Sequence, residues 1–238
     1  MRGLEVEKNV FVAHFDILGM SSVLRKSNGR AWLLLCDLAE ACETEELPLS
    51  VEMRKNLGEK FFSDTIILHT CNDDTASLHS IVARSFEIFR SAFRVGIPLR
   101  AGIAHGAWIE VTSGRHDLFA GDALLRAYHI GETQQLISIA ICDVTRERFL
   151  KTPFSFNSGL PVIKDYFIPV KGGVNSNRAV LNWPALCQYH LSNLKPLSAN
   201  ALANHFSEFG SYETLGDIEK AKYENTVAFI QSLKGMNY

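Results

Sequence analysis

The chain has 238 residues, a formal net charge of −2 and a hydrophobic fraction of 47%. This length and composition allow one large domain, or a core with an appendage, around a sizeable hydrophobic core. The balanced charge argues against a dedicated nucleic-acid binder, which normally presents a basic face, and leaves small molecules and proteins as partners.

The five cysteines contain no CxxC pair, so they predict neither a disulfide framework nor a zinc site. No apolar run approaches the ~20 residues of a membrane span, and the first nine residues lack the apolar core of a signal peptide. We therefore expect a soluble, cytoplasmic protein with reduced thiols and no membrane partner.

The first apolar run, residues 10–15, is typical of a strand buried on both faces, and it ends at Asp16. Gly19 permits the positive φ of a tight turn, and Ser21 or Ser22 would cap the helix that follows. A strand, a turn and a helix N-terminus beside Asp16 would suit a phosphate and its metal ion.

A second acidic residue, Asp64, lies between two further apolar runs, 60–62 and 65–68. Ser63 and Asp64 predict the tip of a β-hairpin whose strands are too apolar for the surface. An aspartate at a strand end is usually a turn former or a cap. Two of them at adjoining strand ends, however, can share Mg²⁺ or Mn²⁺, which prefer oxygen ligands.

Helices are expected on both sides of this hairpin. The first covers residues 21–46 with a break at 27–29, and the second covers 74–93 with Asp74 as its cap. The inward-facing residues of the first helix are expected to be Trp32, Leu34, Leu35, Leu38 and Ala39.

The strand near residues 97–106 alternates between large and small side chains. Its large face, which should carry the helices, contains Ile97, Leu99, Ala101 and Ile103, and its other face contains Arg100, Gly102, Ala104 and Gly106. The small face suggests that something approaches the backbone there. Arg100 could bind phosphate through its fork of donors, or it could form a surface ion pair.

The order strand, helix, paired strands, helix, strand fits an α+β sandwich of the ferredoxin-like kind, with an antiparallel-rich sheet and helices on one face. The other face would be free for a second subunit or a ligand. We expect residues 1–183 to form this domain and residues 184–238 to form a C-terminal helical extension.

The stretches FDILGMSS, FFSDTI and PLRAGIAHG, in this order, resemble the catalytic core of class III nucleotide cyclases. The stretches FSDTI, GDALLRAY and DYFIPVK are most similar to the sequences of the uridylate and cytidylate cyclases of bacterial Pycsar anti-phage systems. The similarity covers about residues 8–183.

This resemblance implies that Asp16 and Asp64 bind two Mn²⁺ or Mg²⁺ ions, with the carbonyl of Ile17 as a further ligand. It also implies that Arg100 contacts phosphate and that Lys171 reaches the terminal phosphate from the partner subunit of a homodimer. The substrate-binding set would be Phe15, Ile17, Leu18, Gly19, Met20, Ser21, Lys60 and Lys171. Lys60 matches a base-reading lysine of purine cyclases, or it is a solvated strand lysine.

The sequence departs from the purine cyclases on the helix after the phosphate-binding strand. Leu125 and His129 stand where those enzymes carry an Asn and an Arg that orient the ribose and stabilise the transition state. Arg126 is a possible substitute, although it projects about 100° away from Leu125 around the helix. His129 is expected to be structural.

By resemblance, the chain would convert UTP, or as second choice CTP, into the 3′,5′-cyclic monophosphate and pyrophosphate. The product would act as a second messenger of anti-phage defence on a cyclic-nucleotide-responsive effector. Two alternatives stay open. The chain could be a catalytically degenerate nucleotide-binding sensor, or a structural interaction module whose carboxylates serve as hairpin and cap residues.

Overall fold

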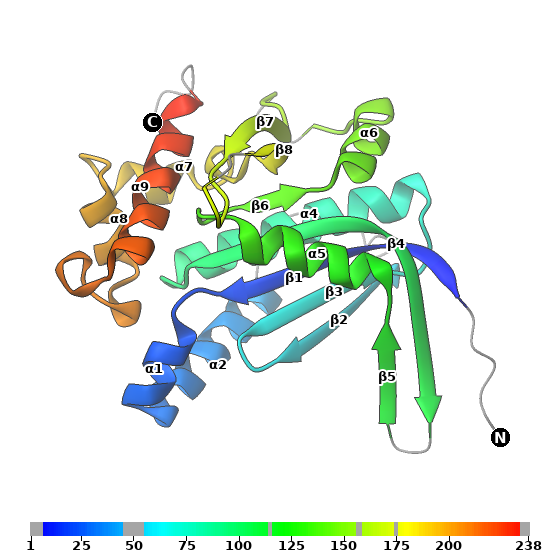
Figure 1. Ribbon diagram of the computed structural model, residues 1–238, viewed down its shortest axis with the longest axis horizontal. Helices are drawn as coiled ribbons and strands as arrows, with labels where there is room; N and C mark the ends of the chain where they lie inside the picture. The colour runs from blue at the N-terminus through cyan, green and yellow to red at the C-terminus, as the bar shows by residue number, and fades with distance from the viewer. Residues whose placement is uncertain (1–6, 45–54, 114–115, 156–158, 174–175, 234–238) are drawn as a thin grey trace.

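The computed structural model describes residues 7–44, 55–113, 116–155, 159–173 and 176–233 (Figure 1). Its strands are β1 (Lys8–Ile17), β2 (Leu57–Phe62), β3 (Thr65–Thr70), β4 (Leu99–Ser113), β5 (His116–Ala120), β6 (Ile139–Ile141), β7 (Ile163–Ile168) and β8 (Ser176–Leu181). Its α-helices are α1 (Met20–Lys26), α2 (Asn28–Thr44), α4 (Thr75–Arg94), α5 (Asp122–Thr133), α6 (Asp143–Lys151), α7 (Gln188–Ser192), α8 (Ala199–His205) and α9 (Asp217–Ser232).

The strands form one open sheet in the order β2-β3-β1-β4-β6-β8-β7, and β5 pairs with β4 outside this order. All neighbours are antiparallel except β4 and β6, which are parallel. The register places Asp16 opposite Thr65 on one side and opposite Arg100 on the other. The predicted α+β architecture with an antiparallel-rich sheet is therefore confirmed.

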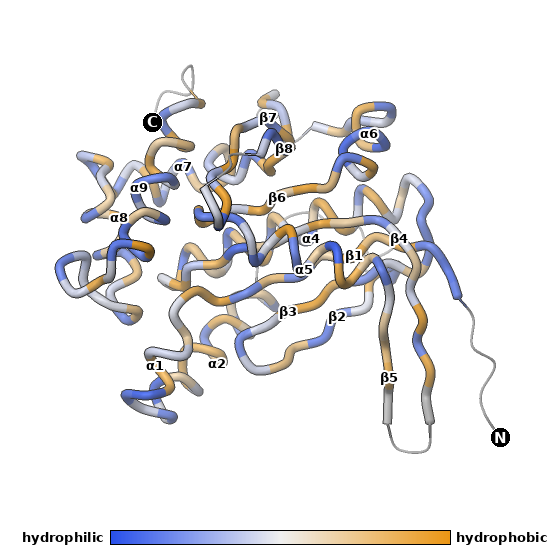
Figure 2. The backbone as a smooth tube through the Cα atoms, viewed as in Figure 1, coloured by the Kyte–Doolittle hydropathy of each residue, from blue (hydrophilic) through white to orange (hydrophobic). Residues whose placement is uncertain are grey.

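Helix α4 covers one face of the sheet, and α2 packs against α4. The side chain of Asp74 caps α4 by accepting a hydrogen bond from the backbone N–H of Ser77, as predicted. The hydroxyl of Ser91 donates to the carbonyl of Ala41 at 3.1 Å, which ties the two helices together. Hydrophobic residues follow β1, β3 and β6 through the middle of the molecule (Figure 2).

Helix α5 lies on the opposite face of the sheet, so the prediction that helices cover one face is wrong in this respect (Figure 1). The small residues on this face of β4 leave room for α5 to pack against the strand backbone. A Cβ added at Gly102 would lie 2.2 Å from the carbonyl oxygen of Ala127 and 2.8 Å from the backbone nitrogen of Gly131. The chain's own helix therefore approaches the backbone there, where a ligand or a second subunit was expected.

Two further expectations need correction. Trp32 was expected to face inward, but it is 67% exposed, whereas Leu34 and Leu38 are buried. Strand β2 is too exposed for a core strand because it forms the sheet edge, and Phe62 is 78% exposed. The expected break in the first helix is confirmed, since α1 ends at Lys26 and α2 begins at Asn28, so that Ser27 alone separates them. The expected last residues of this helix, 45–46, lie outside the described part.

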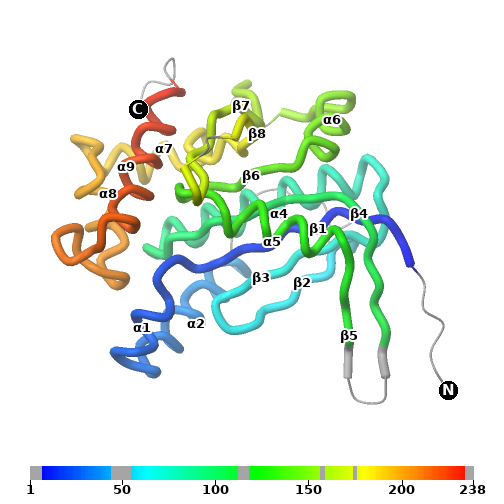
Figure 3. Tube along the Cα trace, viewed as in Figure 1, coloured from blue at the N-terminus to red at the C-terminus, as the bar shows by residue number. Residues whose placement is uncertain are grey.

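The helices after β8 share one hydrophobic core with the sheet. Leu202, Phe206, Phe229 and Ile230 are buried in that core, and Phe229 packs on Tyr166 of β7 with ring centroids 5.0 Å apart. Figure 3 shows α8 and α9 at the same end of the molecule as α1. In the described part of the chain, no helix combines the length and apolar character needed to cross a bilayer.

Candidate active site

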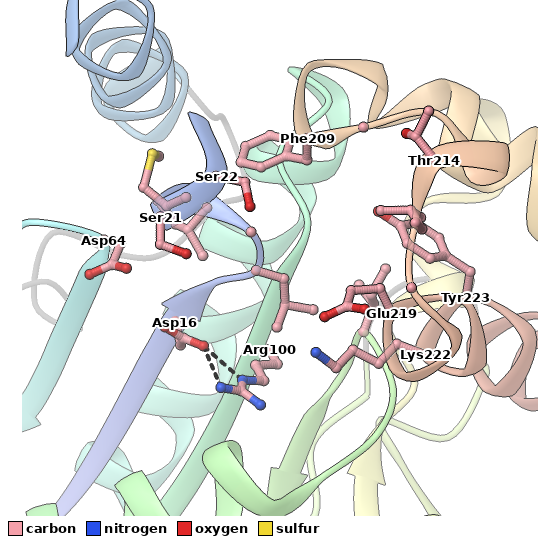
Figure 4. A pocket seen from close by; sticks show the side chains of 18 of the residues that line it. Asp16, Ser21, Ser22, Asp64, Arg100, Phe209, Thr214, Glu219, Lys222 and Tyr223 are labelled. Carbon is pink, nitrogen blue, oxygen red and sulfur yellow. Dashed lines mark hydrogen bonds and ion pairs between the residues drawn. The ribbon is translucent and has the colours of Figure 1, made fainter. Parts of the chain in front are cut away.

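A cavity of about 650 Å³ opens beside the end of β1 and the adjoining ends of β3 and β4 (Figure 4). Most of the predicted site residues line it, namely Asp16, Ile17, Leu18, Gly19, Met20, Ser21, Asp64 and Arg100. The volume lies within the range of roughly 300–1,000 Å³ that is typical of small-molecule sites.

The two aspartates come together because their strands are neighbours. The backbone N–H of Ile17 donates to the carbonyl of Asp64 at 2.9 Å, and the strands of such a pair lie about 4.8 Å apart. Ser63, with a φ of 54°, makes the tight hairpin turn that brings Asp64 to this position. Two carboxylates and the carbonyl of Ile17 offer the oxygen donors that Mg²⁺ and Mn²⁺ prefer. Across the described residues, no group of three or more His, Cys, Asp or Glu side chains forms a metal-binding cluster.

In the turn after β1, Gly19 has the positive φ that was predicted, but the helix begins earlier than predicted. Gly19 has a φ of 81°, in the left-handed region that glycine adopts without strain. The helix begins directly at Met20, with Gly19 at its N-cap position and no side-chain cap. Ser21 and Ser22 therefore lie inside the first turn of α1, and the prediction that one of them caps the helix is wrong.

Arg100 lies opposite Asp16 on the neighbouring strand and is 6% exposed. Its Nε donates to Oδ2 of Asp16 at 2.7 Å, and its Nη1 donates to the carbonyl of Glu132 at 3.0 Å. The Nη2 group contacts the carboxylates of both Asp16 and Glu132. The guanidinium therefore orients Asp16, and its donors are already engaged with the protein. The predicted contact between Arg100 and phosphate stays a prediction.

Glu132, at the C-terminal end of α5, connects Arg100 to a second predicted residue, because Lys171 forms an ion pair with the same carboxylate. Burial opposes ionisation of Glu132, but Lys171 and Arg100 outweigh it and hold the pKa of this carboxyl below its ordinary value. Lys171 does not line the cavity. The predicted role of Lys171 in a partner's site is one that this single chain does not test.

Two other predicted residues lie outside the cavity lining. The side chain of Phe15 is fully buried in the core. Lys60 forms an ion pair with Glu110 at 2.8 Å and lies over the ring of Phe119, 5.1 Å from its centroid. The structure therefore does not bring Lys60 together with the two aspartates of its own chain.

The helix positions that depart from the cyclase pattern lie on the outer surface of α5. Leu125 is 55% exposed, and His129 is also exposed. Arg126 forms an exposed ion pair with Asp122 at 2.7 Å, one turn earlier on the helix. None of these three residues lines the cavity.

The second wall of the cavity comes from the C-terminal segment, which sequence reasoning left without a function. This wall includes Phe209, Thr214, Glu219, Lys222 and Tyr223 (Figure 4). These residues carry no motif, and they follow Arg100 by more than 100 positions. They reach the site only because the segment from Phe209 to Tyr223, two short 3-10 turns followed by the start of α9, docks beside the sheet.

Neither family models nor curated proteins yield a match to this sequence. Solved structures do resemble the fold. The adenylyl cyclase CyaB from P. aeruginosa matches with a TM-score of 0.54 and 14% identity over 74% of this chain and 94% of that chain. The guanylyl cyclase domain of the RhoGC fusion protein from the aquatic fungus Blastocladiella emersonii also matches with a TM-score of 0.54 and 14% identity, over 76% and 98%.

A bacterial light-regulated adenylyl cyclase gives the same TM-score of 0.54, over 79% of this chain and 57% of that chain. At 14% identity these likenesses concern the fold. The chain thus has the class III nucleotide cyclase fold, and its aspartate pair lies at the rim of the central sheet.

Proposed function

We propose that this chain is a metal-dependent nucleotide cyclase that acts on a pyrimidine nucleoside triphosphate, UTP before CTP. The proposal depends on one observation above all, that Asp16 and Asp64 line the same cavity in a cyclase fold. The pyrimidine preference comes from the resemblance of FSDTI, GDALLRAY and DYFIPVK to Pycsar cyclases.

In the proposed reaction the ribose 3′-oxygen attacks the α-phosphorus, the bond to the β-phosphate oxygen breaks, and the hydroxyl proton and pyrophosphate leave. Asp16, Asp64 and the carbonyl of Ile17 would hold two Mn²⁺ or Mg²⁺ ions, which lower the pKa of the hydroxyl and bind the triphosphate when present. The chain itself contributes position. Arg100 fixes the Asp16 carboxylate, and the turn at Gly19 presents backbone N–H groups beside it.

The wider proposal includes a homodimer with two equivalent sites, in which Lys171 of each chain serves the other chain's site. It also includes a cyclic-nucleotide-responsive effector that receives the product as an anti-phage signal. These parts are supported by the resemblance to the Pycsar cyclases.

The test is incubation with Mn²⁺ and, separately, UTP, CTP, ATP or GTP, followed by mass spectrometry of the products. We expect cyclic UMP or cyclic CMP together with pyrophosphate. Asp64→Ala should abolish the product while the thermal unfolding temperature stays close to that of the wild type, because Asp64 occupies a hairpin tip. Undiminished product from Asp64→Ala would refute the metal assignment.

A nucleotide-binding sensor is the second candidate, and the exposed Leu125 and His129 in place of an Asn and an Arg favour it. The same four incubations separate the two functions. Stabilisation by Mn²⁺ with a nucleotide, but without any cyclic product, would indicate the sensor.

A further inference from the structure

The C-terminal wall of the cavity contacts helix α2 and the turn that follows β1. Arg30 of α2 donates to Glu208 through Nε at 2.9 Å and through Nη2 at 2.6 Å. Phe209 packs directly over the turn, since a Cβ added at Gly19 would lie 3.5 Å from its ring. This wall is therefore part of the site in the single chain.

Helix α9 is anchored to the loop that precedes β6. Thr226 accepts a hydrogen bond from the backbone N–H of Ile137 at 2.9 Å, and the side-chain amide of Asn225 donates to the carbonyl of Gln135 at 2.7 Å. Tyr223, which lines the cavity, is 6% exposed. The position of α9, and of any side chain that it directs into the cavity, is therefore well defined.

Lys222 is the cation that α9 directs into this cavity. In Figure 4 its side chain extends from the helix toward Arg100 and Asp16. Among the described residues, no carboxylate forms an ion pair with its ammonium group, whereas Arg100 is saturated by Asp16 and Glu132. The other cations of the lining, Arg25 and Lys26, are exposed on α1.

We propose that Lys222 binds a phosphate group of the substrate, so that the C-terminal segment completes the triphosphate site of its own chain. This inference depends on the proposed function for the identity of the ligand, a nucleoside triphosphate. It also assigns a role to residues 207–223, which lie beyond the part of the chain that resembles cyclases.

The electrostatic surroundings of Lys222 agree with an anionic ligand. Burial lowers the pKa of Lys222 from its ordinary value of 10.5, and the positive charge of Arg100 lowers it further, while Glu219 and Asp16 act in the opposite direction. A partly buried ammonium group beside a guanidinium gains stability when an anion enters. A phosphate provides that charge and accepts hydrogen bonds from the ammonium group.

The experiment compares Lys222→Gln, Lys222→Arg and Lys220→Gln in the full chain. Inorganic triphosphate with Mn²⁺ is the probe, and its dissociation constant is measured by calorimetry, which requires no turnover. The Lys222→Gln variant loses a charge-assisted hydrogen bond and should bind triphosphate more weakly, by a factor on the order of ten to a hundred. Lys222→Arg should retain most of the affinity.

Lys220→Gln is the matched control because it removes the same charge from the same helix outside the cavity lining. Its affinity should equal that of the wild type. Unchanged binding by Lys222→Gln, or an equal loss in Lys220→Gln, would overturn the assignment. A wild-type chain that binds triphosphate through Lys222 but forms no cyclic nucleotide would reject the cyclase proposal alone.

Discussion

The Arg100 side chain connects three regions of the site at the level of single residues. It joins Asp16 of β1 to Glu132 of α5, and Glu132 in turn binds Lys171. An always-charged guanidinium suits this position because its planar fork can serve two carboxylates at once. The Asp16 carboxylate is therefore held in place by the chain's own side chains.

We expect Arg100→Met to lower the free energy of unfolding by about 1–3 kcal/mol. Removing one partner of a fully buried ion pair costs about 3–5 kcal/mol. The loss should be smaller here because the side chains of Asp16 and Glu132 are 26% and 32% exposed and water can solvate them. Urea unfolding measures the change.

The control for this variant is Arg146→Met, which breaks the more exposed ion pair between Arg146 and Asp165. A pair of this kind contributes little to stability. Equal losses in the two variants would show that the Arg100 contacts have no special structural role.

The sequence predicted the residues that belong to motifs and missed those that only tertiary structure delivers. Asp16 and Asp64 were found because each ends or begins an apolar strand, and such strands pair. Glu132 and Lys222 lie on helices with no local signal, so their convergence on Arg100 depends on how α5 and α9 dock. Phe15 was assigned to the site by resemblance, yet strand alternation directs its side chain into the core.

At the level of elements, α5 packs directly on the backbone of β4 beside the site. Gly102 allows the helix backbone to touch the strand, and Glu132 follows at the end of the same helix. The sequence signal for this contact is the small residues at 102, 104 and 106. It correctly predicted that another group approaches the backbone of β4 closely. The approaching group could not be identified, because a periodic pattern does not say which segment packs on it.

We expect Gly102→Ala to destabilise the protein by at least about 2 kcal/mol, since overpacking of this kind costs about 1–3 kcal/mol or more. The new methyl group would lie 2.2 Å from the carbonyl oxygen of Ala127, so α5 would have to move. Thermal and urea unfolding measure the loss.

Gly106→Ala is the comparison variant on the same strand face. Its methyl group would meet Ala123 and Asp122 at 3.1 Å, a contact that a small adjustment relieves. The loss should therefore be clearly smaller than for Gly102→Ala. A larger loss at Gly106 would mean that α5 packs on β4 differently.

At the level of the whole molecule, the long β4 strand continues past β1, and among the described residues its last part pairs with β5 alone. This two-stranded arm projects from the body of the protein (Figure 1). Two strands alone are marginally stable in water. A second chain placed against the arm would cover it, in agreement with the proposed homodimer.

Mixing two inactive variants tests that dimer. If Lys171 serves the partner's site, a heterodimer of Asp64→Ala and Lys171→Ala contains one intact site. Random exchange of subunits should then restore about a quarter of the wild-type activity, because half of the dimers are mixed and each has one working site of two. Product formation after mixing is compared with each variant alone.

The control mixture combines Asp16→Ala with Asp64→Ala. Both residues belong to the same half of the site, so no heterodimer of these two variants contains an intact site, and activity should stay absent. Full activity from a protein that sediments as a monomer would contradict the shared site.

The burial of Phe206, Phe229 and Ile230 beside the sheet has a practical consequence. A shortened version that stops after β8 would remove these residues and expose to water the hydrophobic side chains of the sheet that they cover, among them Tyr166, which would promote aggregation. Failure of such a fragment in an assay would reveal nothing about catalysis. Expression plans, and searches for relatives of this protein, should keep the last helices attached.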